Sequence, residues 1–345
     1  MAGYSAMYND LPRPPKSAFH VAGPNFKMTS GDLGILKSTL LPSFGLYSGL
    51  SLATYIAAQR TDRVELKDWL WPSGQVINAW WTAIGRPMYE TNISFSDAWT
   101  GLTWTEKVLL GCVSVWGCRL FARIASRSLK RGKDDSRYDA CKKEPGFWKT
   151  AFFKIFLPEA AVLTLISLPF TVPFSMGDTT LSLATNTISS IRAFGAAVFA
   201  TGFGMEVMAD TQLELHRQER SDLCRHGVWG LVRHPNYLGD TLVHVSFAIL
   251  NLSDSFNPIT LIGPLTNYLF LRYIGGDKQT EASQEERYRA EDPHKHKQLQ
   301  EWRADSNSFW PSFHDLANPW ALAVAGCGII GVVLEEGLRS AFNML

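Results

Sequence analysis

The sequence lacks the cysteine patterns that mark zinc fingers, redox motifs and disulfide frameworks. Its 345 residues contain five cysteines, and none of them forms a CxxC pair or a zinc-ligand spacing. Reduced thiols that face lipid or cytosol are therefore expected, and no metal is predicted as a partner. A strongly basic balance is also missing. The chain has 33 Lys and Arg against 32 Asp and Glu, a formal net charge of +1, which gives no electrostatic reason to predict nucleic acid as a partner.

Several catalytic signatures are absent as well. The chain contains no HExxH, GxSxG, P-loop or Rossmann glycine motif. If a dinucleotide binds, it is therefore not held by a Rossmann fold. Residues 1–33 are predicted to be a polar N-terminal tail, without the basic start and apolar run of a secretory signal. The C-terminus carries no KDEL-type signal.

What the sequence does contain is a strong segregation of apolar and charged blocks. Mean hydropathy is only −0.05, but 12 Trp and 20 Phe are a heavy aromatic load of the kind found at membrane interfaces. Several blocks are long enough for a bilayer core of about 30 Å. The long blocks are residues 35–58, 104–125, 150–174, 189–208 and 320–338, and the shorter pieces are 69–84, 241–252 and 258–273. We predict an all-α, multi-pass transmembrane helical bundle of about 7–8 membrane segments.

Some of these segments have more specific expectations. Residues 69–84 contain Pro72 and Gly74, which indicate a broken span or a re-entrant piece, and 86–101 reads as a polar loop. The pieces 241–252 and 258–273 predict a tight helical hairpin. The glycines Gly326, Gly328 and Gly331 favour helix–helix contact in the last segment.

The charged blocks predict a topology. Residues 127–149, 212–240 and 275–314 are rich in charge of both signs, whereas 175–188 carries no Lys or Arg. With one span between each pair of loops and a hairpin at 241–273, all three charged blocks fall on one side, which the positive-inside rule makes cytoplasmic. A soluble all-helical protein is the alternative.

The stretch from His226 to Asp240, HGVWGLVRHPNYLGD, concentrates chemistry between two apolar segments. Pro235 is expected to end or interrupt a helix, so that the polar side chains around it cluster on an irregular segment. These side chains are Arg233, His234, Asn236, Tyr237 and Asp240. Cations, an amide and a hydroxyl suit a phosphate-bearing cofactor. The alternative is a helix boundary whose cations sit at lipid headgroups.

Two carboxylates precede this stretch. Glu206 and Asp210 are four residues apart and therefore share one helical face. They could accept hydrogen bonds from a ribose, a nicotinamide amide or a lining arginine, or they could form salt bridges to Arg217 or Arg233 that only fix loop positions. His294 and His296 lie in a charged stretch and are expected to be solvated.

Several motifs in order along the chain resemble one family. GVWGLVRHPNYLGD is followed by Glu286-Arg287-Tyr288, and then by Glu301-Trp302-Arg303 and Phe309-Trp310-Pro311. It is preceded by the E-x-x-A-D-x-Q element at 206–212 and by a D-x-R-Y-D loop at 135–139. Over roughly residues 116–311, the chain resembles the membrane steroid 5α-reductase/sterol reductase superfamily. The resemblance is greatest to its branch with a steroid 5α-reductase C-terminal-type domain.

The resemblance implies a multi-helix membrane fold with a cytoplasmic-side pocket for NADPH, and hydride transfer to a carbon–carbon double bond of a sterol, steroid or other lipid. It implies substrate-side helices at 34–125, a cofactor-binding membrane region at 126–317 and a terminal helix at 318–345, in a multi-pass protein of the endoplasmic reticulum. The implied cofactor-binding residues are Arg233, His234, Asn236, Tyr237, Asp240, Asp210, Trp229, Arg287, Tyr288 and Arg303. Tyr237 and Glu206 are the implied catalytic residues.

Two other functions remain open at this point. The isoprenylcysteine carboxyl methyltransferases share an R-H-P-x-Y-x-G core and use S-adenosylmethionine; Asn236 and Asp240 favour the reductase. The third possibility is a lipid-binding membrane protein without catalytic activity.

Overall fold

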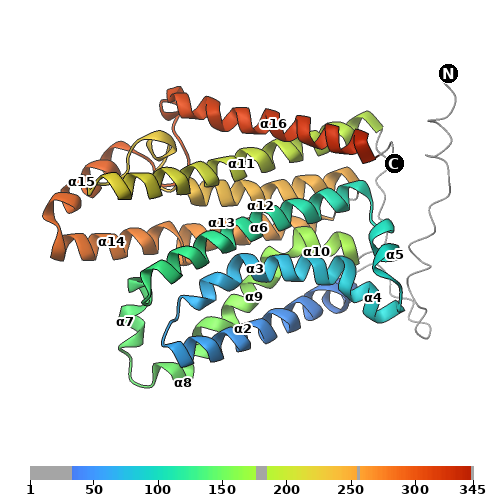
Figure 1. The fold of residues 1–345 in the computed structure, drawn as a ribbon, viewed down its shortest axis with the longest axis horizontal. Coiled ribbons are helices and arrows are strands. Elements are labelled where there is room, and N and C mark those ends of the chain that lie inside the picture. The colour runs from blue at the N-terminus through green and yellow to red at the C-terminus, as the bar shows by residue number, and fades with distance from the viewer. Residues whose placement is uncertain (1–32, 176–184, 255–256, 343–345) are drawn as a thin grey trace.

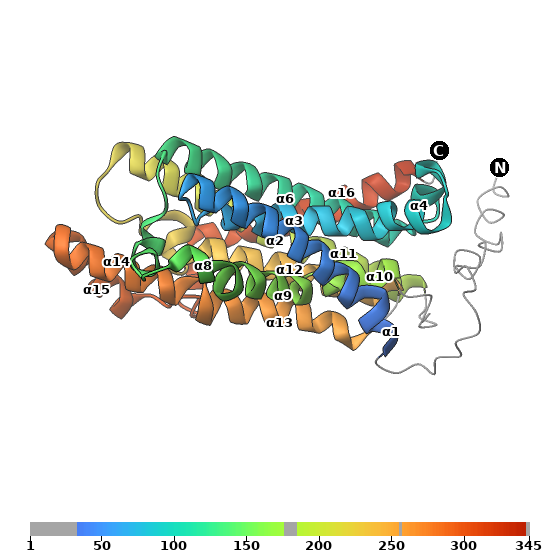
Figure 2. The ribbon, with the colours of Figure 1, turned by 90° about the horizontal axis from the view of Figure 1, so that it is seen from below.

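A computed structural model describes residues 33–175, 185–254 and 257–342, and within these ranges the chain is helical with no strand (Figure 1). The helices that form the bundle run side by side along one direction (Figures 1 and 2). They are α2 (Leu41–Thr61), α3 (Leu66–Trp80), α6 (Trp104–Arg131), α9 (Leu157–Ile166), α11 (Thr185–Glu219), α12 (Pro235–Asp254), α13 (Ile262–Leu269) and α16 (Pro319–Phe342). The predicted all-α bundle is therefore confirmed. The predicted tail falls almost entirely outside the described residues.

Four helices are long and apolar enough to cross a membrane. They are Leu36–Thr61, Trp104–Arg131, Asn186–Glu219 and Pro319–Phe342. Phe147–Ile166 and Leu168–Ser175 (α10) form a fifth candidate that is bent by 62°. Pro169 near the start of α10 fits this break, because proline donates no backbone hydrogen bond. The chain is thus a membrane protein with four candidate spans, or five if the bent pair crosses once.

Helix α6 shows how the sequence sets its own boundaries. Thr103 and Glu106 form a capping box at its start, which satisfies backbone N–H groups that lack a helical partner. At its end, Gly132 adopts a left-handed conformation with φ of 69°, which glycine tolerates without strain. The predicted span at 104–125 therefore continues into the first charged block.

The centre of the bundle is α12, which contacts α6, α10, α11 and α13. Most of its side chains are buried. It forms the predicted hairpin with α13, although residues 255–256 of the connection lie outside the described residues. Asp240 and His244 of α12 are polar but buried inside the bundle, where such groups need partners.

Two glycines allow α11 and α12 to touch backbone to backbone. A Cβ atom added to Gly239 would lie 2.6 Å from the Gly202 carbonyl oxygen, and one added to Gly202 would lie 2.6 Å from the Gly239 carbonyl oxygen. Small residues permit such close approach between membrane helices. Gly328 and Gly331 of α16 make similar contacts with α11, as predicted, whereas Gly326 faces open space.

Replacing Gly239 by leucine is expected to force these two helices apart. Overpacking a well-packed interior costs about 1–3 kcal/mol, and here the clashing atoms belong to backbone that cannot rotate away. Thermal unfolding of the purified protein in detergent measures the loss. Gly111→Leu is the matched control, because its added atoms meet open space on α6. Equal unfolding temperatures for the two variants would contradict the contact.

The charged blocks gather at one end of the bundle. That end carries α7 (Asp139–Lys142), α8 (Phe147–Ala151), α14 (Asp277–Glu291) and α15 (Pro293–Asp305), whereas α4 (Arg86–Thr91) and α5 (Phe95–Thr100) lie at the other (Figure 1). The short helix η4 (Ser136–Tyr138) contacts α14, which joins the first and third blocks. This is the arrangement that the alternation of charge predicts.

The remaining elements are short. They are α1 (Leu33–Ile35), η2 (Leu36–Leu40), η3 (Trp81–Gly85), η5 (Phe152–Phe156), η6 (Gly227–Gly230), η7 (Pro258–Leu261), η8 (Phe270–Ile274) and η9 (Asp315–Ala317).

Three local predictions were wrong. Pro235 does not interrupt a helix but begins α12, where its missing N–H leaves no helical bond unmade. Pro72 lies inside the continuous helix α3, so residues 69–84 are not a broken span. The stretch 86–101 is not simply a polar loop, because it contains α4 and α5.

Candidate functional site

One carboxylate holds the arginines of two distant motifs together. Arg233 donates from Nε to Glu281 Oε1 at 2.9 Å, and Arg303 donates from Nε to Glu281 Oε2 at 2.9 Å. His234 Nε2 lies 2.9 Å from the same Oε1 atom. The two arginines therefore share a site, as predicted, but they share it around a glutamate of α14 that the sequence did not single out.

Backbone contacts explain why these motifs meet. The N–H groups of Arg233 and His234 donate to the carbonyl oxygens of Asn307 and Ser308, at 3.0 and 3.1 Å. These bonds hold the segment that follows α15 against the segment that precedes α12. Arg233 precedes α14 in the sequence and Arg303 follows it, and both side chains contact this helix.

The electrostatics of Glu281 reflect its three partners. Burial alone would raise its pKa, but hydrogen bonds from His234 and Arg233 and their positive charges lower the pKa to about 2. The ionised form is therefore the stable form in this arrangement, and Glu281 fixes the position of α14.

Replacing Glu281 by glutamine is expected to lower the free energy of unfolding by roughly 1.5–3 kcal/mol, because charged hydrogen bonds are lost. A lowered pKa gives stability that is complete above the unfolded value of about 4.3 and is lost as pH falls toward 2. The variant should thus be equally destabilised at about pH 7 and about pH 5. Thermal unfolding at both values measures this, with exposed Glu286→Gln as control. A deficit that disappears at the lower value would contradict the assignment.

The start of α12 carries the rest of the predicted motif. The Tyr237 hydroxyl lies 3.2 Å from Thr280 Oγ1 of α14, and its ring stacks on His234 with centroids 5.4 Å apart. Within the described residues, Asn236 Oδ1 is buried without a hydrogen-bond partner. A buried acceptor without a partner is uncommon and marks a place where a ligand could donate.

Deeper in the bundle, the two predicted carboxylates share an arginine that the sequence analysis did not assign. Arg119 of α6 donates from Nη1 to Glu206 Oε1 at 2.9 Å and from Nη2 to Asp210 Oδ2 at 2.5 Å. Arg123 adds a hydrogen bond to the Asp210 carbonyl oxygen at 2.9 Å. The salt bridges expected as one alternative therefore exist, but their partners are not Arg217 or Arg233.

A second buried chain of polar groups lies beside Glu206. Asp240 Oδ1 lies 2.8 Å from His244 Nδ1, and His244 Nε2 lies 3.0 Å from Gln75 Oε1 of α3. Asn267 Nδ2 of α13 donates to Asp240 at 3.3 Å. Four helices thus contribute polar side chains to the interior, which is costly in a membrane protein unless those groups are paired or functional.

Arg217 has two arginine neighbours on other helices, and none of the three has an acidic partner among the described residues. Arg217, at the end of α11, lies within electrostatic range of Arg127 of α6 and Arg287 of α14. In the described part of the chain, none of the three forms an ion pair, and Arg287 makes only a 3.4 Å hydrogen bond to Tyr288. We call Arg127, Arg217 and Arg287 the arginine cluster. Its like charges repel one another and so favour a bound anion.

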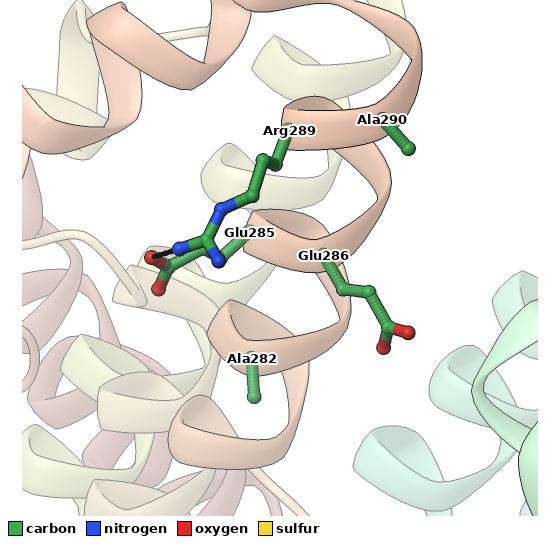
Figure 3. Close-up of a pocket in the computed structure, with 5 residues that line it drawn as sticks. All are labelled: Ala282, Glu285, Glu286, Arg289 and Ala290. Atoms are coloured by element: carbon green, nitrogen blue, oxygen red, sulfur yellow. Dashed lines mark hydrogen bonds and ion pairs between the residues drawn. The ribbon is translucent and has the colours of Figure 1, made fainter.

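The outer face of α14 borders an open hollow of about 620 Å³, shown in Figure 3. Ala282, Glu285, Glu286, Arg289 and Ala290 line it. Arg289 turns toward Glu285 and pairs with it at 3.0 Å, whereas Glu286 points away from them. Arg287 is on the same helix but is not among the residues that line the hollow, which share one face of α14.

Two further predicted groups have structural contacts. The Trp229 indole is buried and donates to the Ala209 carbonyl oxygen at 2.9 Å, which packs η6 on α11. In the D-x-R-Y-D loop, Arg137 and Tyr138 both donate to Asp68 of α3 at 2.8 Å. These contacts hold η6 against α11 and the 135–139 loop against α3, at the charged end of the bundle.

Sequence reasoning missed Glu281, Arg119 and His244. Arg119 and His244 carry a usable signal, because an ionisable residue inside an apolar helical segment needs a partner. Glu281 carries none, since it is one acidic residue in a stretch full of them.

Comparison with known proteins gives one match. A family described as a protein of unknown function, DUF1295, matches residues 54–301. No curated protein matches, and no solved structure does. The matched range contains every predicted site residue except Arg303 and includes Arg119, Glu281 and the arginine cluster.

Proposed function

The chain belongs to the DUF1295 family of proteins of unknown function, and from its site we propose that it is an NADPH-dependent membrane reductase. The proposed substrate is a carbon–carbon double bond of a sterol, steroid or other lipid. NADPH is the proposed cofactor, and the charged end of the bundle is its proposed binding site.

The observation that carries the proposal is the arginine cluster, whose members come from α6, α11 and α14. NADPH has a pyrophosphate and a 2′-phosphate, and planar guanidinium groups bind phosphate oxygens in pairs. Arg127, Arg217 and Arg287 offer three such groups that no acidic side chain neutralises among residues 33–175, 185–254 and 257–342. Glu286 at the edge of the hollow suits ribose hydroxyls.

Other groups of the site also fit a nicotinamide nucleotide. The unsatisfied Asn236 Oδ1 could accept a hydrogen bond from a carboxamide. Arg233, His234 and Arg303 hold Glu281, and through it they would set the position of Arg287 on the same helix. Tyr288 lies under the Arg287 guanidinium at 5.0 Å and would keep it oriented.

NADPH, when bound, supplies a hydride. The chain must then supply a proton to the neighbouring carbon, and two groups are proposed as catalytic residues. Tyr237 offers a phenol beside Thr280 at the start of α12. Glu206 offers Oε2, which is buried and has no hydrogen-bond partner in the described ranges, while Arg119 holds its other oxygen. Asp240, Asp210 and Trp229 line or support the same region.

The membrane arrangement follows from the same features. We propose that α3, α12 and α13 also cross the membrane, shielded by the four candidate spans, which gives about 7–8 segments in all. The basic end would face the cytoplasm, where NADPH is present. The proposed location is the endoplasmic reticulum.

The methyltransferase alternative fits the arginine cluster less well. S-adenosylmethionine carries a positive sulfonium and a single carboxylate, so it would leave most of the cluster's charge unbalanced. The choice is tested by incubating the purified protein with NADPH and a panel of unsaturated sterols and lipids. The proposal predicts oxidation of NADPH with one class of lipid and a product heavier by two hydrogens.

Two outcomes would contradict it. Transfer of a methyl group from S-adenosylmethionine, without NADPH oxidation, would identify the methyltransferase. Saturable lipid binding without any cofactor binding would identify a lipid-binding protein.

A further inference from the structure

A cysteine and two histidines converge where α11 ends. His216 lies in the last turn of α11, and Cys224 and His226 lie in the segment that leads to η6. One ring nitrogen of each histidine and the Cys224 Sγ all lie within 4.8 Å of one another. His216 and Cys224 are buried, whereas His226 is exposed. This trio plays no part in the proposed reductase site.

The hydrogen bonds of His216 leave one nitrogen free for a ligand. Its Nε2 atom lies 3.0 Å from the Asp222 carbonyl oxygen and 3.1 Å from Asp222 Oδ1. Both atoms are acceptors, so Nε2 carries the proton and Nδ1 of the neutral ring carries a lone pair. Among the described residues, this Nδ1 is buried with no hydrogen-bond partner.

This pattern is the one that metal-binding histidines show. Such a histidine donates its second ring nitrogen to a carboxylate or a backbone carbonyl, which fixes the tautomer and directs the free lone pair at the ion. Asp222 supplies both kinds of acceptor at once. An unpartnered buried nitrogen is otherwise unfavourable, because it has lost its hydrogen bond to water.

We propose that His216, Cys224 and His226 bind a zinc ion. Two imidazoles and a thiolate are the ligand types that zinc prefers, and a water molecule would complete a tetrahedron. Three ligand atoms within 4.8 Å of one another can converge on one ion at metal–ligand distances of about 2.0–2.3 Å, and exposed His226 can adjust to complete the geometry.

The position of the trio gives the ion a structural role. It would tie the end of α11 to the segment that enters the RHPNY motif. The same segment is held to α15, because Leu223 N–H donates to Gln298 Oε1 at 3.1 Å. The ion would thus fix how α11, η6 and α15 meet, whether or not NADPH binds.

Metal analysis of the purified full-length protein tests the proposal. After treatment with a chelator and addition of zinc, the wild type is expected to retain one zinc per chain by mass spectrometry of the metal. Cys224→Ser and His226→Ala are each expected to weaken zinc binding by more than about a hundredfold. Loss of a residue that only hydrogen-bonds to a metal ligand costs about 10- to 100-fold. His226→Ala should fold normally, because His226 is exposed.

Two controls and a second readout make the result decisive. Cys118→Ser and His314→Ala change an exposed cysteine and a histidine outside the trio, and they should retain the metal. Cobalt in place of zinc should give a thiolate charge-transfer absorption that Cys224→Ser abolishes. The proposal is overturned if the wild type holds no more zinc than the Cys224→Ser/His226→Ala double variant.

Discussion

Replacing Arg217 and Arg287 together by alanine is expected to weaken NADPH binding by about a hundredfold or more. Each charged hydrogen bond to a phosphate is worth roughly 1.5–3 kcal/mol, and each 1.4 kcal/mol is about a factor of ten in affinity. The two residues come from α11 and α14 and lie within electrostatic range of each other. Quenching of tryptophan fluorescence by NADPH, titrated in detergent, measures the dissociation constant.

The matched control for this variant is Lys130→Ala. Lys130 lies on α6 in the same charged end, but its side chain is 77% exposed and it pairs with Glu214 at 3.5 Å. Its removal should change NADPH affinity by less than about threefold, because exposed charges are screened by salt. If both variants bind NADPH as the wild type does, the arginine cluster is not the phosphate site.

Replacing Arg119 by leucine is expected to lower the free energy of unfolding by about 3–5 kcal/mol. Removing one partner of a buried ion pair leaves the other charge without compensation. Here the remaining partner is Glu206, whose side chain is only 3% exposed, while Asp210 keeps its contact with Arg123. Thermal or denaturant unfolding in detergent measures the difference.

A second substitution separates this effect from simple loss of packing. In the Arg119→Leu/Glu206→Leu double variant, no unpaired carboxylate remains at position 206, and apolar replacement of a buried pair is often neutral. The double variant is therefore expected to recover most of the lost stability. It should not recover NADPH turnover if Glu206 supplies the proton. A double variant as unstable as Arg119→Leu would show that the pair is not the source of the loss.

The sequence was informative about the membrane helices because their signal is local. An apolar run long enough to cross a bilayer is uncommon outside membrane helices, so the spans near residues 35–58, 104–125, 189–208 and 320–338 could be placed in advance. The sequence also predicted that the three charged blocks lie at one end, because that prediction requires only the number of apolar segments between the blocks. The family resemblance implied one site for Arg233 and Arg303, and the structure shows that both arginines pair with Glu281.

The contacts inside the site could not be predicted in the same way. Arg119 lies within the predicted span at 104–125, and its partners lie 87 and 91 residues further along the chain. Pairing at that separation depends on how α6 and α11 pack, which no local pattern encodes. Pro235 was misread for a related reason, because proline disrupts a helix interior but suits the first turn.

The trio of His216, Cys224 and His226 shows a similar limit. Its spacing of H-x7-C-x-H differs from the zinc motifs that sequence patterns describe. The residues come together because α11 ends at Glu219 and the chain folds back toward η6. The sequence spacing therefore gave no signal for a trio that only the fold brings together.

The most direct test of the central claim is a side-by-side titration of the wild-type protein in detergent with NADPH and with NADH. The two cofactors differ only in the 2′-phosphate. If the arginine cluster binds that phosphate, NADPH should bind saturably and at least about tenfold more tightly than NADH, and added salt should narrow the gap. Equal affinity for the two cofactors, or no saturable binding of either, would contradict the account.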